Sequence, residues 1–375
     1  MTPAPDSPRE SAPGPARALL SERVRAEAAH VARSLTTFGP ARGRRWPLAV
    51  QAGLAMAVPI VALALTGHDR LALLAASGAF TVIYGGWLRP RERARFAPLI
   101  ALALVSCAAA GTLAAAGGTP VVLAGVLVLT IVSAAVAGWV SLGPPGPIFF
   151  VLVFGLSAQV TGLHGGVRAV QPGEYLLVVA GASAFACLIV AAPLLLPRYH
   201  REPRRSLREA FPRRWGAAAR TLTIRATIIA VVGAAAATVV DPTRSYWIVC
   251  AGLAVAVAGT PVGRRDAATR GIHRIVGTAL GAAVYLLLAG APLPIWMLGI
   301  VLGTLQFLIE MVVVRHYALA LVFITPLVLL LIGAATGATV GSGAMPLATE
   351  RVIDTLVGAV TGTLAALAVP LRAER

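Results

Sequence analysis

The sequence is dominated by repeated apolar runs of about 18 to 22 residues, separated by short polar segments. A helical run of this length crosses the hydrocarbon core of a bilayer, which is about 30 Å thick. Of the 375 residues, 58% are hydrophobic and only 13% are charged, whereas soluble domains average about a quarter charged residues. A soluble core could not bury so much apolar surface, so the sequence predicts an all-α polytopic membrane protein.

The apolar runs predict about twelve transmembrane helices, arranged as two groups of six. We expect a cytoplasmic tail at 1–45, a first membrane region at 46–196, a basic linker at 197–223 and a second membrane region at 224–371. The expected spans lie at about 46–66, 71–88, 97–116, 120–141, 147–163, 175–196, 224–240, 246–262, 272–289, 293–313, 316–333 and 350–370.

The tail before the first span contains no apolar stretch typical of a signal peptide. Within it, residues 19–35 predict an amphipathic helix with an apolar stripe flanked by arginines and a glutamate. Such a helix would lie on an anionic membrane surface or dock on the protein's own loops, and the sequence favours neither alternative.

Arginine clusters occupy alternate segments between the apolar runs, and this pattern predicts topology. With the N-terminus inside, the inner segments hold the clusters at 42–45, 89–95, 197–220 and 264–274. The outer turns hold only isolated arginines, Arg70, Arg168, Arg244 and Arg351. The net charge of +17 is therefore explained by the positive-inside rule, not by nucleic-acid binding. We expect a plasma-membrane protein with both termini in the cytoplasm and with lipid as a partner.

The two halves resemble each other in their charged landmarks. Gln51 and Arg70 have the same separation as Arg225 and Arg244, and a basic–acidic–basic cluster follows in each half. Six spans are an even number, so the repeats would share one orientation, related by an axis along the membrane normal. Substrate paths in such proteins lie at the interface between repeats.

The segment RGIHRIVGTALGAAVYLL at 270–287 resembles a motif of the fusaric acid resistance (FUSC), or aromatic acid exporter, superfamily. In that superfamily a basic loop precedes the pattern R-I-x-G-T-x-x-G. The segments at 225–271, 315–331 and 350–364 also resemble the family, whereas 46–196 resembles it only loosely. Many members carry a large soluble region, which the short linker here does not provide.

This resemblance implies export of small organic acids, aromatic carboxylates among them. A distant similarity to plant aluminium-activated malate transporters leaves an anion channel as an alternative. A structural membrane module that assists an envelope partner is a second alternative. The sequence contains no Walker A, HExxH or GxSxG motif, so we expect neither an enzyme nor a nucleotide-driven pump. We expect no cofactor and no metal, while a homo-oligomer remains open.

Acidic residues within spans are costly to bury and are often functional. Glu310 lies near the inner end of its predicted span, and Asp354 lies one turn into the last span. Both are candidates for proton coupling. The alternatives are structural: Glu310 would pair with Arg315 or with the basic loop, and Asp354 would pair with Arg351, three residues earlier.

Several arginines are candidates for binding an organic anion, because a guanidinium binds a carboxylate bidentately. The candidate substrate-binding residues are Arg225, Arg270, Arg274, Thr278 and Arg351. The alternative for Arg225 is an interfacial anchor that reaches lipid phosphates.

Two pairs of glycines, each four residues apart, predict close helix packing. They are Gly277 with Gly281 and Gly358 with Gly362. The aromatic residues Trp46, Tyr246 and Trp247 are expected to lie in interfacial belts at the membrane surface.

Overall fold

The computed structural model of the chain describes residues 15–40, 43–164, 166–197, 199, 205–257, 262–291, 293–336 and 343–371. Parts of the predicted tail (1–14) and of the predicted linker (198 and 200–204) lie outside these residues. The chain divides into two compact units, Met1–Phe38 and Gly39–Arg375. The first unit contributes a single described helix, α1 (Pro15–Thr36), which spans the predicted amphipathic segment.

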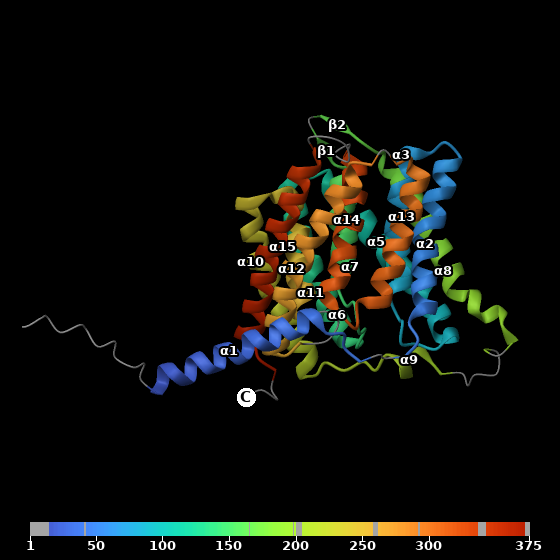
Figure 1. The fold of residues 1–375 in the computed structure, drawn as a ribbon. Helices are drawn as coiled ribbons and strands as arrows, with labels where there is room; N and C mark the ends of the chain where they lie inside the picture. Colours follow the sequence, from blue (N-terminus) through green and yellow to red (C-terminus); the bar gives the residue numbers. More distant parts are fainter. Residues whose placement is uncertain are drawn as a thin grey trace, which may run out of the picture. The chain divides into compact units, whose positions relative to one another are not determined.

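The second unit is built from helices that run roughly side by side (Figure 1). The longer ones are α2 (Trp46–Leu65), α5 (Pro90–Ala115), α6 (Gly118–Trp139), α7 (Ile148–Thr161), α8 (Pro172–Ala191), α10 (Ala217–Val240), α11 (Ser245–Ala256), α12 (Arg264–Ala289), α13 (Ile295–Val312), α14 (Tyr317–Thr336) and α15 (Ala344–Ala368). Short elements connect them: α3 (Asp69–Ala72), η1 (Leu73–Ala75), α4 (Ala76–Ala79), η2 (Phe80–Ile83), β1 (Leu163–His164), β2 (Val167–Arg168), η3 (Ala192–Leu195), α9 (Leu207–Ala210) and η5 (Pro242–Arg244).

Within the described residues, eight helices are long and apolar enough to cross a membrane. They are α2, α5, α6, α8 with its 3-10 extension, α10, α12, α13 and α15. The helices α7 and α14 are also apolar, but their apolar stretches are shorter. The prediction of an all-α polytopic membrane protein is therefore confirmed, whereas the twelve-helix layout stays a prediction.

The predicted second span at 71–88 is wrong as a continuous helix, because the chain there forms the short elements α3, η1, α4 and η2 in succession. Every residue from Ala72 to Val82 is buried, so this segment has no lipid-facing side. A fully buried apolar segment is shaped by its neighbours, and 3-10 turns tighten it locally. An apolar composition indicates that a segment is buried, but it does not decide between α-helical and 3-10 hydrogen bonding.

The predicted boundary near residue 272 is also wrong, because α12 already begins at Arg264. The arginine-rich segment forms the first turns of this helix and is not a loop. The acidic side chain of Asp266 lies in the first turn, where a negative charge interacts favourably with the helix dipole. The same applies to α5, in which Glu92 accepts a hydrogen bond from the backbone N–H of Arg89 (3.2 Å).

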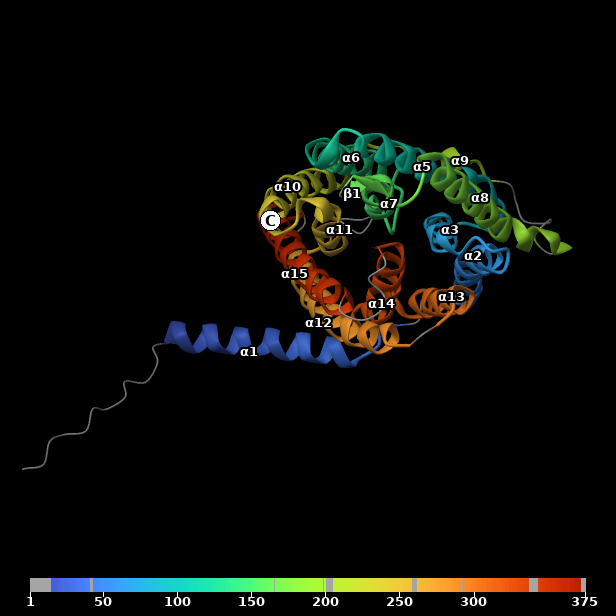
Figure 2. The same ribbon diagram turned by 90° about the horizontal axis from the view of Figure 1, so that it is seen from above.

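Seen along the helices, α10, α6, α5, α8, α2, α13, α12 and α15 follow one another around a ring (Figure 2). The helices α7, α11, α14 and α3 lie inside it. Two contacts join the halves of this ring: α2 packs against α13, and α10 packs against α6. Each contact therefore pairs the first long helix of one half with the α6 or α13 helix of the other.

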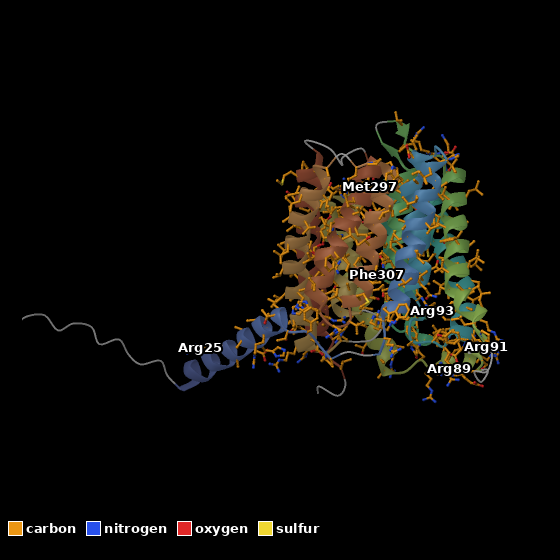
Figure 3. The ribbon with its side chains drawn as sticks, turned by 45° about the vertical axis from the view of Figure 1, so that its right-hand side comes forward. Arg25, Arg89, Arg91, Arg93, Met297 and Phe307 are labelled. Atoms are coloured by element: carbon orange, nitrogen blue, oxygen red, sulfur yellow. The ribbon has the colours of Figure 1, made fainter. Side chains whose placement is uncertain are left out.

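The arginines of the α5 start mark one end of this helical unit. Arg89, Arg91 and Arg93 lie together at that end, whereas Met297 of α13 lies toward the opposite end (Figure 3). We call these the arginine-rich end and the opposite end. The hairpin of β1 and β2, in which Leu163 pairs with Arg168, connects α7 to α8.

Candidate functional site

Close contacts between helices α11, α12, α14 and α15 create the candidate site. A Cβ added at Gly277 would lie 2.4 Å from the carbonyl oxygen of Ala318 on α14. A Cβ at Gly358 would lie 2.3 Å from the carbonyl oxygen of Ile248 on α11. No Cβ fits at such distances, so these glycines allow the helix backbones to approach directly. Cβ atoms at Gly281 and Gly362 would lie 2.7 Å from Cβ of Thr325 and 2.5 Å from the carbonyl oxygen of Gly252.

A set of buried polar side chains lies among these four helices, and we call it the polar seam. Its members are Arg274 and Thr278 on α12, Thr325 on α14, and Arg351, Asp354 and Thr355 on α15. All six are less than 9% exposed. The four helices contact one another, since α12 packs on both α14 and α15, and α11 packs on α15.

Polar atoms of the seam lack hydrogen-bond partners within the described part of the chain. They are Nε of Arg274 and Arg351, Oδ2 of Asp354, and the hydroxyls of Thr278, Thr325 and Thr355. A buried polar atom without a partner costs about 1–3 kcal/mol, and a charged one costs more. Such a concentration is unusual for a core whose only task is packing.

The electrostatic interactions of the seam centre on Arg351, which lies near both the guanidinium of Arg274 and the carboxylate of Asp354. Arg351 is attracted electrostatically by Asp354 and repelled by Arg274. Asp354 and Arg351 form no ion pair within 4.0 Å in the described structure, so the simple pairing expected from their spacing is not what the geometry shows. Arg274 donates one hydrogen bond, from Nη1 to the hydroxyl of Tyr317 (2.8 Å).

The Trp247 ring contacts two arginines, one of them a member of the seam. The guanidinium carbon of Arg351 is 4.9 Å from the Trp247 ring centroid, and that of Arg244 is 5.5 Å away. Arg244 also forms ion pairs with Asp241 and Glu350. Cation–π contacts of this kind strengthen where water is excluded.

The prediction that Tyr246 and Trp247 belong to an interfacial belt is wrong, because both side chains are completely buried. The physical reason is the short α11, whose residues are buried on every side from Ser245 to Ala256. The Tyr246 hydroxyl donates to Oε1 of Gln159 on α7 (2.5 Å), which ties α11 to the other half of the chain. Trp46, in contrast, is 56% exposed, as an interfacial residue would be.

Arg225 lies outside the seam, at the arginine-rich end of α10. Its guanidinium is fully buried and donates to the carbonyl oxygens of Ala256, Val262, Ala366 and Val369. These carbonyls lie at or near the ends of α11, α15 and the segment that leads into α12, so in this geometry the Arg225 guanidinium is engaged with backbone and is not exposed to lipid or solvent. Arg270 lies on α12, with its guanidinium carbon 5.5 Å from the ring centroid of Tyr317.

Glu310 lies near the end of α13 and is ion-paired with Arg45, whose Nη2 is 2.9 Å from Oε2. Nε of Arg45 also donates to the backbone carbonyl of Glu310 (2.9 Å). Arg315, one of the two expected structural partners, donates from its Nε to the carbonyl oxygen of Gly39 (3.3 Å). The packing of α2 along α13 brings Arg45 over the carboxylate.

The sequence reasoning did not select Trp247, Thr325 or Thr355 for the site. Thr355 follows Asp354 directly, so a search for polar residues inside predicted spans would have found it. Thr325 precedes a proline in an otherwise apolar helix. Trp247 carried no signal, because a Tyr-Trp pair at a predicted span end is typical of a membrane interface.

Comparison with known proteins agrees with this description. The chain is a multi-helix membrane protein, and residues 226–365, which contain the whole polar seam, match the family described as Fusaric acid resistance protein-like. The resemblance inferred from the sequence is confirmed, because this region of the chain is similar to the FUSC family model.

One curated relative supports the same assignment. The uncharacterized membrane protein YvaC of Bacillus subtilis (strain 168) is 34% identical over 125 residues, which is 32% of this chain. The match spans only 18% of that relative's length. No solved structure matches the chain.

Proposed function

We propose that this protein is a secondary transporter that exports small organic acids, aromatic carboxylates among them, across a bacterial plasma membrane. The observation that carries the proposal is the polar seam, where two buried guanidiniums have Nε donors without a hydrogen-bond partner among the described residues. A guanidinium binds a carboxylate through parallel, charge-assisted hydrogen bonds. An anion between Arg274 and Arg351 would relieve their mutual repulsion, and the Thr278 hydroxyl would donate a further hydrogen bond.

The remaining predicted substrate residues contribute unequally to this proposal. Arg270, one turn before Arg274 at the arginine-rich end of α12, would attract anions toward the seam. Arg225 has its donors occupied by backbone carbonyls, so we assign it no contact with substrate. The glycine pairs would let α12 and α15 move against α14 and α11 without side chains interlocking.

Proton coupling is assigned to Asp354. Its side chain is 2% exposed, and its Oδ2 has no hydrogen-bond partner within the described residues. A carboxylate that lies beside the anion site would repel a bound anion when ionised and would tolerate it when protonated. Glu310, the other predicted coupling residue, is held by Arg45, and this ion pair favours a structural role.

The two-repeat, twelve-span layout remains part of the proposal, and the contacts between helices support it. In the first half, α5 packs on α7 and α8; in the second half, α12 packs on α14 and α15. The joining contacts, α2 with α13 and α6 with α10, are also equivalent under an exchange of halves. Repeats that exchange in this way are related by an axis along the membrane normal.

Equivalent hydrogen bonds also support the repeat. The Gln51 amide donates to the carbonyl of Ile189 at the end of α8, as Arg225 donates to carbonyls at the end of α15. In each half a buried guanidinium also donates to a carbonyl near the end of the segment that follows the first long helix. Arg93 donates to Val82 in η2, and Arg225 donates to Ala256 at the end of α11.

The orientation follows from the same arrangement. The arginine-rich end would face the cytoplasm, with both chain termini there, because arginine favours that side of the membrane.

The experiment is flux of radiolabelled benzoate and 4-hydroxybenzoate in proteoliposomes, with and without an imposed proton gradient. A coupled exporter accumulates substrate against its gradient only when the proton gradient is present. An anion channel of the same architecture would give flux that follows the substrate gradient alone. Absence of flux for any organic anion would favour a structural membrane module.

A variant pair addresses the coupling residue. Asp354→Asn should keep substrate exchange but lose accumulation driven by protons, because an amide mimics only the protonated acid. Ile353→Ala, on the lipid-facing side of the same helix, serves as the matched control and should transport normally. Proton-driven accumulation by Asp354→Asn would remove Asp354 from the mechanism.

A further inference from the structure

A shallow apolar groove lies where the end of α6 meets the segment that leads into α10. It encloses about 350 Å³ and is lined by Ala135, Val136, Trp139 and Trp215. The two tryptophans are 42% and 52% exposed. Because α6 and α10 are both candidate membrane spans, a groove at their ends lies at the boundary between hydrocarbon and headgroups.

Two exposed arginines contact a residue of this groove, and a third follows on α10. Arg213 places its guanidinium carbon 5.5 Å from the Trp139 ring centroid. Arg214 is held beside it, because its backbone N–H donates to the carbonyl oxygen of Trp139 (2.9 Å). Arg220 lies one turn into α10. In the part of the chain that the structure describes, no carboxylate forms an ion pair with any of the three.

The other junction between the halves contains a carboxylate that pairs with its arginine. Where α2 meets α13, the Arg45 guanidinium is neutralised by Glu310, 2.9 Å away. Both junctions join the first long helix of one half to the α6 or α13 helix of the other, and both lie at the arginine-rich end. Glu310 lies near the end of α13. The residue at the corresponding place near the end of α6 is Val136, which lines the groove.

An apolar surface runs from the groove toward the middle of the helices. On α6, the exposed side chains of Val128, Val132 and Val136 recur every four residues and therefore lie on one face. On α10, Ile224 and Val231 are similarly exposed. This surface is long enough to contact an acyl chain along several turns of helix.

We infer that an anionic phospholipid binds at the junction of α6 and α10. Its phosphate lies against Arg213, Arg214 and Arg220 and supplies the negative charge that Glu310 supplies at the other junction. Its glycerol region lies between Trp139 and Trp215, and an acyl chain follows the valines of α6. Tryptophan rings at the headgroup level and arginine beside phosphate are the contacts that such a lipid needs.

Thermal unfolding of the purified full-length protein in detergent tests this inference, with phosphatidylglycerol and phosphatidylcholine titrated separately. We expect phosphatidylglycerol to raise the unfolding midpoint at concentrations at which phosphatidylcholine has no effect. The triple variant Arg213→Gln, Arg214→Gln, Arg220→Gln should weaken the apparent affinity for phosphatidylglycerol at least about tenfold, given roughly one kcal/mol for each basic residue near an anionic headgroup. Equal responses to the two lipids would overturn the inference.

The matched control is the double variant Arg95→Gln, Arg208→Gln, which removes exposed arginines of the same end away from the groove and should retain the wild-type affinity. A second variant, Val136→Glu, places a carboxylate in the groove without removing an arginine, and it too should weaken phosphatidylglycerol binding. Wild-type affinity in both groove variants, or equal stabilisation by glycerol phosphate without acyl chains, would rule out a lipid at this junction.

Discussion

The two halves of the helical unit pack in the same order but bury different side chains. The helices α5 and α12 have equal lengths of 26 residues, and each begins in its basic cluster. At the positions where α12 buries Arg274 and Thr278, α5 buries Ile100 and Leu104. In the first half, α5 therefore packs closely on α7 and α8 without a buried charge at these positions.

The last helices of the halves differ in the same way. Aligned by their repeated pattern, Arg351 and Thr355 of α15 correspond to Tyr175 and Val179 of α8, and all four are buried. Tyr175 is satisfied by Ser157, with 2.8 Å between the hydroxyls, whereas Nε of Arg351 has no partner among the described residues. Polar groups that packing does not require and that remain unsatisfied are the strongest indication of a binding site in this fold.

The largest effect is expected from removing a charge of the seam. Arg351→Gln should lower the rate of organic-anion uptake by about 100-fold, because a charge-assisted hydrogen bond contributes about 1.5–3 kcal/mol and each 1.4 kcal/mol is a factor of ten. Initial rates in proteoliposomes at low substrate concentration measure this change. Tyr175→Phe, at the equivalent position of the first half, should transport within about twofold of wild type, since it removes one neutral hydrogen bond. Equal losses in the two variants would show that the halves do not differ in function.

The next effect concerns the equivalent positions Gln51 and Arg225. Arg225→Gln should lower the free energy of unfolding by about 2–3 kcal/mol, because several buried carbonyls at the ends of α11 and α15 lose charged donors. Gln51→Ala should cost only about 1 kcal/mol, the typical contribution of a neutral hydrogen bond. Thermal unfolding in a single detergent compares them, and a larger loss for Gln51→Ala would contradict the structural role given to Arg225.

The smallest expected effect is the difference in stability between alanine variants of two glycines, Gly78 and Gly252. Each packs against the last helix of its own half. A Cβ at Gly78 would lie 2.5 Å from the backbone nitrogen of Ser183, whereas at Gly252 the nearest atom is the side-chain Cγ2 of Ile229, at 2.7 Å. A side chain yields more easily than a backbone, so Gly78→Ala should destabilise by about 2 kcal/mol and Gly252→Ala by about 1 kcal/mol. Gly181→Ala in α8 has open space and should be neutral or slightly stabilising. Chemical unfolding of the three variants gives the order, and a reversed order would show that α8 and not α15 adjusts its position.

Much of the architecture could be predicted from residue patterns alone. The apolar runs around Trp46–Leu65 and Ile295–Val312 are helices with nearly the expected bounds. The family resemblance at 270–287 was also readable, because glycine spacing and arginine placement are local in sequence. The prediction was wrong for 71–88, because no local property of a fully buried apolar segment separates one long helix from several short turns.

The candidate site was only partly predictable. Arg274, Thr278, Arg351 and Asp354 were selected because polar residues inside apolar runs are conspicuous. Their gathering between α12 and α15, 73 or more residues apart in the chain, depends on helix contacts that residue patterns do not specify. The guanidinium of Arg225 donates to backbone carbonyls, whereas Nε of Arg351 has no partner among the described residues, and this difference likewise follows from which helix ends lie nearby.

By itself, the sequence determined that this protein lies in a membrane, that its helices carry small residues for close contact, and that its arginines concentrate at one end. These properties depend on the free energy of transferring each side chain from water to hydrocarbon, and that free energy is a property of the residue type. Only the tertiary structure decided which buried charges are neutralised. Glu310 is paired because α2 lies along α13, whereas several polar atoms of the seam, where four other helices meet, lack partners among the described residues. Whether a buried charge finds a partner depends on distances between helices, and those are set by packing over the whole unit.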